Sequence, residues 1–187
     1  MEGLVARKTP KECMMIVLDY RRALLDTAVT DHRIGYAASS TAAAELIQDA
    51  RTALLKRLPP ADLTPEQLRE RSWWQGSDLY IIVDDYDLVA TSNNPLAPLA
   101  ELLPQARDIG LHLIISRQMG GASRSMFDPA VQRLKEMASP ALIMSGNKDE
   151  GALFGNVRPQ PLPQGRGFYV DRRSGARLIQ TAFLDTP

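Results

Sequence analysis

The chain has 187 residues, and its 22 basic and 22 acidic side chains give a formal net charge of +0. Hydrophobic residues make up 44% and charged residues 24%, which is typical of globular proteins and excludes a disordered or fibrous chain. This length is sufficient for one domain with a hydrophobic core, and we expect a single domain over residues 1–187. The neutral charge gives no overall electrostatic reason to bind nucleic acid or an anionic membrane, so partners must be inferred from local sites.

Cysteine usage and hydropathy indicate the compartment. Cys13 is the one cysteine of the sequence, which excludes an internal disulfide, and two histidines are too few for a zinc site. No run reaches the roughly 18 apolar residues that span a bilayer, and the first residues lack the pattern of a signal peptide. We therefore expect a cytoplasmic chain with no direct membrane insertion.

Buried strands and amphipathic helices alternate from the start of the chain. Residues 13–18 form an uninterrupted apolar run that stops at Asp19, which predicts a strand buried on both faces. Residues 41–58 carry apolar side chains three and four positions apart, which predicts an amphipathic helix. Thr64, with Gln67 three residues later, is typical of a capping box and predicts the start of a second, short helix.

The same alternation continues in the second half. Three apolar runs predict further central strands, at residues 79–83, 111–115 and 141–144. Residues 94–110 predict a helix with a kink at Pro104 and an end at Gly110. Residues 128–137 predict another helix, which an Asp-Pro pair opens.

The order of these elements predicts the fold class. Continuous apolar strands separated by amphipathic helices indicate an α/β protein with a mainly parallel sheet and helices on both faces. Near the C-terminus, residues 168–170 and 178–184 flank a turn, which predicts a hairpin added at one edge of the sheet.

Polar residues follow three of the predicted strands, and ligands of parallel α/β sheets bind at that edge. Asp19 follows the first strand, Asp84 and Asp85 follow the second, and Ser116 begins the polar stretch after the third. An apolar strand that ends in two acids is typical of a Walker B motif, in which one carboxylate binds Mg²⁺ through water and the next orients the attacking water. The alternative is that the two acids only cap a loop.

Aromatic and apolar pairs outside the strands are candidate binding surfaces. Trp73 and Trp74 are either a binding platform or an anchor that holds a loop on the body of the protein. Two apolar pairs in glycine-bearing loops are the best candidates for an exposed patch that binds a substrate peptide, with burial in the core as the alternative for each. These pairs are Met126 with Phe127 and Leu153 with Phe154.

A phosphate-binding loop of the form G-x-x-x-x-G-K-[ST] does not occur in the 187 residues. The backbone cradle and the lysine that bind the β- and γ-phosphates in P-loop proteins are therefore missing from this sequence. This argues against an ATPase that works on its own.

Two segments resemble FtsK/SpoIIIE-type P-loop ATPases. YIIVDDYDLV at residues 80–89 is similar to their Walker B strand, and LLPQARDIGLHLIISR at residues 102–117 is similar to the helix and turn that lead into their sensor strand. Residues 145–151, 154–159 and 163–167 narrow the resemblance to the C-terminal ATPase module of EccC, the membrane-anchored motor of mycobacterial type VII (ESX) secretion. The resemblance covers nearly the whole chain.

The resemblance implies a RecA-like fold within a multi-domain ring ATPase that uses ATP and Mg²⁺. It implies that Asp84 is the acid on the Mg²⁺ side, that Asp85 occupies the position of the catalytic carboxylate, and that Ser116 and Arg117 replace the Thr-Gln pair of the sensor segment. The family usually has glutamate where this chain has Asp85, which is one methylene shorter, so we expect weak or absent hydrolysis. Residues 3–7 resemble the end of the helix that follows the P-loop, so we expect the preceding strand and loop to lie outside this chain.

The partners that the resemblance implies are EsxB-like substrates of the WXG100 family, other EccC modules and the ESX membrane-complex subunits, at the cytoplasmic side of the inner membrane. Our hypothesis is a substrate-recognition and ring-assembly part of the secretion motor. One alternative is an ATP-hydrolysing module whose P-loop comes from another segment or chain. A second is part of an FtsK-like DNA translocase, which the neutral charge disfavours.

Overall fold

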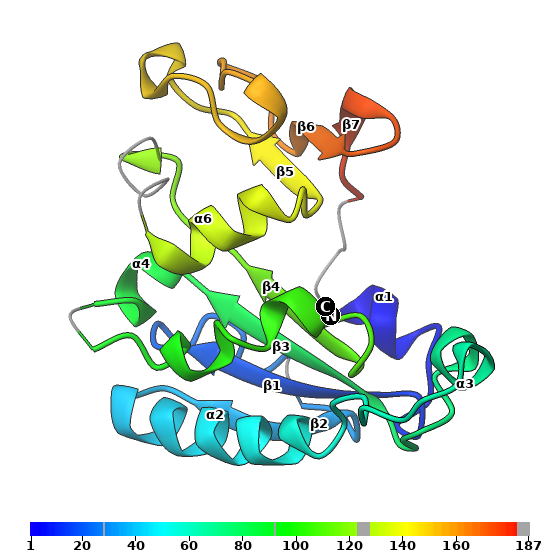
Figure 1. Cartoon of the computed structure of the whole chain (residues 1–187). Coiled ribbons are helices and arrows are strands. Elements are labelled where there is room, and N and C mark those ends of the chain that lie inside the picture. The colour runs from blue at the N-terminus through cyan, green and yellow to red at the C-terminus, as the bar shows by residue number, and fades with distance from the viewer. Residues whose placement is uncertain (28, 92, 123–127, 183–187) are drawn as a thin grey trace. The chain divides into compact units, whose positions relative to one another are not determined.

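The computed structural model describes the whole chain except residues 28, 92, 123–127 and 183–187 (Figure 1). The chain divides into two compact units, Met1–Arg117 and Gln118–Pro187, and each is described by itself. The single domain expected from the sequence stays a prediction. In the described part of the chain, no helix is both long and apolar enough to cross a membrane.

A parallel sheet forms the centre of the first unit. Its strands are β1 (Cys13–Asp19), β2 (Arg33–Ala37), β3 (Asp78–Asp84) and β4 (Leu111–Ile115). Their order is β2-β1-β3-β4, and each neighbouring pair is parallel (Figure 1). The two central strands, β1 and β3, are buried along almost their whole length, as their continuous apolar runs predict. The structure therefore confirms the α/β class and the mainly parallel sheet.

Helices cover both faces of this sheet (Figure 1). The helices of the first unit are α1 (Glu2–Val5), α2 (Ser40–Leu55), α3 (Pro65–Glu70) and α4 (Tyr86–Val89), with the 3-10 turns η1 (Ala97–Leu99) and η2 (Leu103–Gln105), and α3 buries none of its residues. The buried side chains of α2 lie on one stripe, at Ala43, Ile47, Ala50 and Leu54. On the other face, Leu4 and Val5 of α1 pack against a cluster that includes Met15 and Tyr80. The capping box of Thr64 and Gln67 is present at the start of α3.

Two elements of the first unit differ from the prediction. The helix expected at residues 94–110 is wrong, because this segment forms turns and the short 3-10 pieces η1 and η2. Prolines at positions 95, 98 and 104 remove backbone donors that a continuous helix needs. Strand β2 was not predicted, because its residues RIGYA contain a glycine and show neither a continuous apolar run nor strict alternation.

The second unit is built on an antiparallel sheet. Its elements are α6 (Pro129–Glu136), β5 (Ala141–Met144), η3 (Lys148–Glu150), η4 (Phe154–Asn156), β6 (Arg166–Asp171) and β7 (Gly175–Gln180). The sheet order is β5-β6-β7. The hairpin β6–β7 and the helix α6, which Asp128 caps, confirm the predictions for these segments.

The prediction that residues 141–144 form a strand of the parallel sheet is wrong. Strand β5 pairs antiparallel with β6, so the hairpin extends this small sheet and not the parallel one. A short apolar run is compatible with a parallel or an antiparallel sheet. Here the neighbouring strand is β6, which runs in the opposite direction. The core beneath consists of Ala122, Ile143, Leu153 and Val170.

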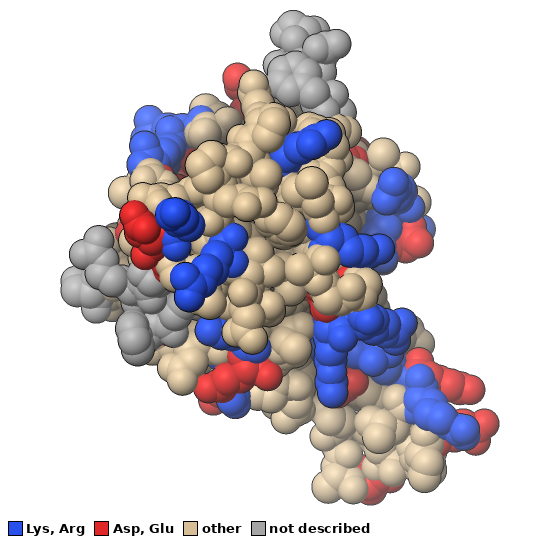
Figure 2. All heavy atoms as spheres, turned by 90° about the horizontal axis from the view of Figure 1, so that it is seen from above, with Lys and Arg blue, Asp and Glu red and all other residues tan. Residues whose placement is uncertain are grey.

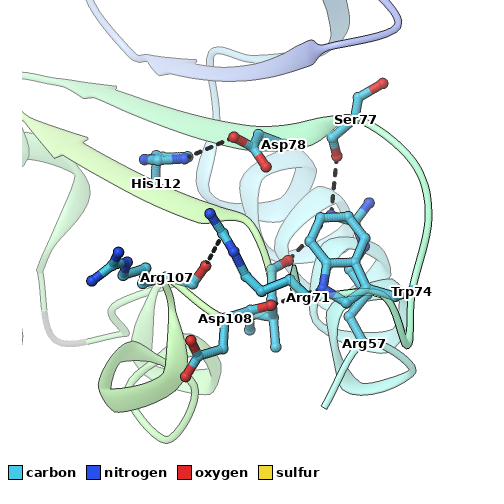
Figure 3. Close-up of polar contacts among 9 residues, drawn as sticks. Arg57, Arg71, Trp74, Ser77, Asp78, Arg107, Asp108 and His112 are labelled. Atoms are coloured by element: carbon cyan, nitrogen blue, oxygen red, sulfur yellow. Dashed lines mark hydrogen bonds and ion pairs between the residues drawn. The ribbon is translucent and has the colours of Figure 1, made fainter. Parts of the chain in front are cut away.

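Trp73 and Trp74 anchor a loop at the end of the parallel sheet where β3 and β4 begin. Figure 3 shows Trp74 beside Arg57 and Asp108. The indole N–H of Trp73 donates to the Arg57 carbonyl at 2.8 Å, and that of Trp74 donates to the Asp108 carbonyl at 2.7 Å. The Arg57 guanidinium lies 4.5 Å from the centre of the Trp74 ring. Gly110 lies so close, with φ +66°, that a Cβ there would meet the same ring at 2.6 Å. The tryptophans therefore have the anchoring role that the sequence left open.

Candidate functional site at the carboxyl edge of the parallel sheet

The strand register brings the predicted acids to one edge. Asp19 at the end of β1 pairs in register with Asp84 at the end of β3. On the other side of β3, Val83 pairs with Ile115, so Ser116 emerges beside Asp84. Residues far apart in the sequence therefore meet at the edge where parallel α/β sheets bind ligands.

Ser116 connects the two strand ends through both its side chain and its backbone. Its hydroxyl donates to Asp84 Oδ1 at 2.8 Å and accepts the backbone N–H of Asp85 at 3.1 Å. Its backbone N–H donates to the Val83 carbonyl, and its carbonyl accepts the N–H of Tyr86. Ser116 therefore fixes the turn in which Asp85 adopts the left-handed conformation, with φ +49°, that aspartate tolerates better than most residues.

Asp85 is nearly buried, with 8% of its surface exposed. Its Oδ2 atom forms an ion pair with Nε of Arg21, whose side chain is 51% exposed. Sequence reasoning missed Arg21. The signal that points to it is its place two residues after Asp19, because a loop that leaves a neighbouring strand end lies at the same edge of the sheet.

Asp19 is fully buried and holds the turn that carries Arg21. Its carboxylate accepts the backbone N–H groups of Ala23 at 3.1 Å and Leu24 at 2.7 Å, and the hydroxyl of Tyr36 on β2 at 2.9 Å. Burial, and then this hydrogen bond to Asp19, raise the pKa of Tyr36. Asp19 thus orders the loop and does not face solvent as an open ligand.

Arg117 has a different partner from Ser116. Its guanidinium donates to Asp87 Oδ1 of α4 at 2.7 Å. Within the segment expected to act as a sensor, Ser116 therefore contacts Asp84, the acid that the sequence predicts to be part of a Walker B motif, and Arg117 contacts the short helix that follows Asp85.

The donor set fits a hydrated Mg²⁺ ion. Among the described residues, no group of three or more His, Cys, Asp or Glu side chains is placed to bind a metal directly. Asp84 with the Ser116 hydroxyl offers hard oxygen atoms, and Mg²⁺ is often bound through one or two carboxylates while it keeps several waters. Asp84 would hold this ion through water, and Asp85 is already paired with Arg21.

The predicted peptide-binding patch lies in the second unit and is only partly described. Leu153 is 4% exposed and belongs to the buried cluster with Ile143 and Val170, while Phe154 is half-buried and packs against that cluster. Met126 and Phe127 lie outside the described residues. The patch stays a prediction, and Phe154 is its accessible described member.

No family model matches the chain. The ESX secretion system protein EccC of Thermomonospora curvata is 65% identical over 184 residues, which are 98% of this chain and 14% of that protein. The ESX-4 secretion system protein EccC4 of Mycobacterium tuberculosis is 44% identical over 98% of this chain and 15% of its own length. The chain thus spans about one seventh of these relatives.

A solved structure of Thermomonospora curvata EccC, which contains ATPases 2 and 3 in complex with a signal sequence peptide, matches the fold. The TM-score is 0.96 at 65% identity, and the match covers 99% of this chain and 33% of that one. Sequence and fold therefore agree with the motif resemblance. The chain belongs to the EccC family of ESX secretion proteins, and it corresponds to their C-terminal ATPase domain.

Proposed function

We propose that this chain is the substrate-recognition module of a type VII secretion motor, and that it supports assembly of the motor ring for protein export. The observation that carries the proposal is the signal sequence peptide bound to the Thermomonospora relative, whose fold matches 99% of this chain. The substrates are EsxB-like proteins of the WXG100 family, bound through their C-terminal signals. The remaining partners are other EccC modules and the ESX membrane-complex subunits, at the cytoplasmic side of the inner membrane.

The proposed contact for the signal is apolar and lies around Phe154. This ring packs on the core of the second unit but keeps part of its surface exposed. A half-exposed aromatic ring gives a peptide a large apolar contact at low cost in side-chain entropy. The neighbouring Leu153 is buried and supports the ring from below.

The test measures the affinity of a fluorescent C-terminal peptide of an EsxB-like protein. We expect F154D to weaken binding at least about tenfold, because a charge replaces an apolar contact at an interface centre. L142D is the matched control, since Leu142 is an exposed apolar residue of the same unit, on strand β5. Near-UV circular dichroism confirms that each variant is folded. Equal affinities of the two folded variants would remove Phe154 from the proposal.

A second candidate function is one half of an ATP site, and the contact between Asp84 and Ser116 favours it. In this case another segment or chain supplies the phosphate-binding loop, and Asp84 binds the Mg²⁺ of the nucleotide through water. Titration of Mg-ATP into this chain, alone and mixed with an EccC module that contains G-x-x-x-x-G-K-[ST], tests it. Tighter nucleotide binding by the mixture than by either protein alone, lost in D84N, is the expected result.

DNA translocation has less support. In Figure 2, acidic side chains lie beside several of the described basic groups. A duplex is usually bound by a continuous basic patch. A salt-sensitive affinity for DNA would revive this alternative.

A further inference from the structure

We propose that Arg158 binds the terminal carboxylate of the signal peptide whose apolar side chain contacts Phe154. The inference rests on the proposed function and deepens it, because it adds a second contact at the same surface of the second unit. Two observations carry it. A closed turn contains Phe154 and ends next to Arg158, and the Arg158 side chain is exposed.

The turn that presents Phe154 closes directly before Arg158. The backbone N–H of Leu153 donates to the Val157 carbonyl at 2.9 Å, and the N–H of Val157 donates to the Phe154 carbonyl at 3.1 Å. The Val157 carbonyl belongs to the peptide group that joins Val157 to Arg158. The backbone of Arg158 therefore lies next to that of Leu153, the residue before Phe154.

Packing fixes this turn on the core of the second unit. Phe154 and Val157 both pack against the buried cluster that contains Val170 of β6. At Gly155, between them, φ is +59°, and a Cβ atom would collide with the same Val170 side chain. The turn is thus formed before a peptide arrives, so little conformational entropy is lost when the peptide binds.

Arg158 is exposed although both of its neighbours in sequence face the protein. Val157 packs against the buried cluster, and Pro159 is buried, so the backbone at Arg158 is held in place. Within the described residues, the Arg158 side chain forms no hydrogen bond or ion pair. Its guanidinium is therefore available for a carboxylate, which it can bind through two parallel N–H···O hydrogen bonds.

The ligand chemistry follows from the kind of peptide that is recognised. A peptide from the C-terminus of a protein carries an α-carboxylate whatever its sequence, and this charge needs a cationic partner when it leaves water. The apolar contact at Phe154 alone cannot distinguish a chain end from an internal segment. Arg158 supplies this distinction, because it favours a peptide whose chain ends beside the ring.

The experiment compares a fluorescent C-terminal peptide of an EsxB-like protein in two forms, with a free terminal carboxylate and with a terminal amide. We expect the wild type to bind the free acid about fivefold more tightly, as for one exposed charge-assisted contact. R158Q should bind both forms with the affinity that the wild type has for the amide. R172Q is the matched control, since it removes an exposed arginine from the β6–β7 turn of the same unit and should keep the preference.

Each outcome decides the inference. A preference for the free acid that R172Q keeps and R158Q loses supports it. Equal affinities of the wild type for the two forms would overturn it and leave peptide recognition in place. A preference that persists in R158Q, or that R172Q loses to the same extent, would overturn it as well. If the wild type bound neither form, the proposed function itself would fail, and this inference with it.

Discussion

The two ends of the parallel sheet in Met1–Arg117 use charged side chains in opposite ways. At the end where β3 and β4 begin, arginines bind backbone carbonyls: Arg57 donates to Ser77 and Ile109, and Arg71 donates to Arg107 (Figure 3). At the end where the strands finish, the charged groups are carboxylates. Asp84 accepts the Ser116 hydroxyl, Asp85 pairs with the exposed Arg21, and Asp19 accepts the Tyr36 hydroxyl.

The difference indicates that the two ends of the sheet have different roles: one stabilises the fold, and the other is the candidate functional site. The Arg57 guanidinium binds backbone carbonyl groups and stacks on the Trp74 ring, and these contacts hold the loop in place. At the opposite edge two of the partners, Ser116 and Arg21, are exposed to solvent. We therefore expect substitutions at the first end to affect mainly unfolding, and substitutions at the acidic edge to affect mainly binding.

Trp74→Ala should have the largest effect on stability. It removes a large ring that stacks with Arg57 and the hydrogen bond to the Asp108 carbonyl. We expect the free energy of unfolding to fall by about 3 kcal/mol in urea titrations. Leu68→Ala, at an exposed apolar position of the same unit, should cost about 0.5 kcal/mol or less. If the two variants were equally stable, the amino end would not be the structural anchor.

Gly110→Ala tests the same end of the sheet, because it adds a methyl group against the Trp74 ring. The new Cβ would meet Trp74 at 2.6 Å, and φ +66° is unfavourable for any side chain. A loss of about 2 kcal/mol in the free energy of unfolding is expected. The partner variant Gly3→Ala, where a Cβ meets nothing within 4 Å, should be neutral. Equal costs for both substitutions would contradict the close packing at Gly110.

Ser116→Ala tests the acidic edge and should cost less stability. It leaves the Asp85 N–H and Asp84 Oδ1 without the hydroxyl that they share, so we expect a loss of about 1 kcal/mol. Ser116→Thr keeps the hydroxyl and should retain most of the stability. A cost in Ser116→Ala as large as that in Trp74→Ala would show that the acidic edge also anchors the fold.

Tyr36→Phe should have the smallest effect, which depends on pH. Burial and the hydrogen bond to Asp19 raise the pKa of Tyr36 in the folded protein above its ordinary value of 10.0. The folded state therefore favours the neutral phenol, and this contribution is complete below pH 10 and is lost as the pH rises through the folded pKa. Unfolding measured from pH 8 to 11 should show a shallower decline in Tyr36→Phe than in the wild type. Parallel curves would contradict the raised pKa.

Much of the fold and part of the site could be predicted from the sequence. Continuous apolar runs identified β1, β3 and β4, and because parallel strands end at a common edge, the contact of Ser116 with Asp84 followed from their positions after two strands. Arg21 could not be found in this way, since it contacts Asp85 from 64 positions away and only the loop conformation set by Asp19 brings it there. The partner of β5 could not be predicted either. Its four apolar residues do not indicate that the chain later turns back as β6 and pairs with β5 in antiparallel orientation.

The most direct test of the recognition function is a calorimetric titration of the intact chain with two ligands in turn. One is the C-terminal peptide of an EsxB-like protein, and the other is Mg-ATP. A recognition module should bind the peptide and should show no heat of binding with Mg-ATP. Binding of Mg-ATP at micromolar concentration with no binding of the peptide would contradict this account, and would make the acidic edge of the parallel sheet the functional centre of the chain.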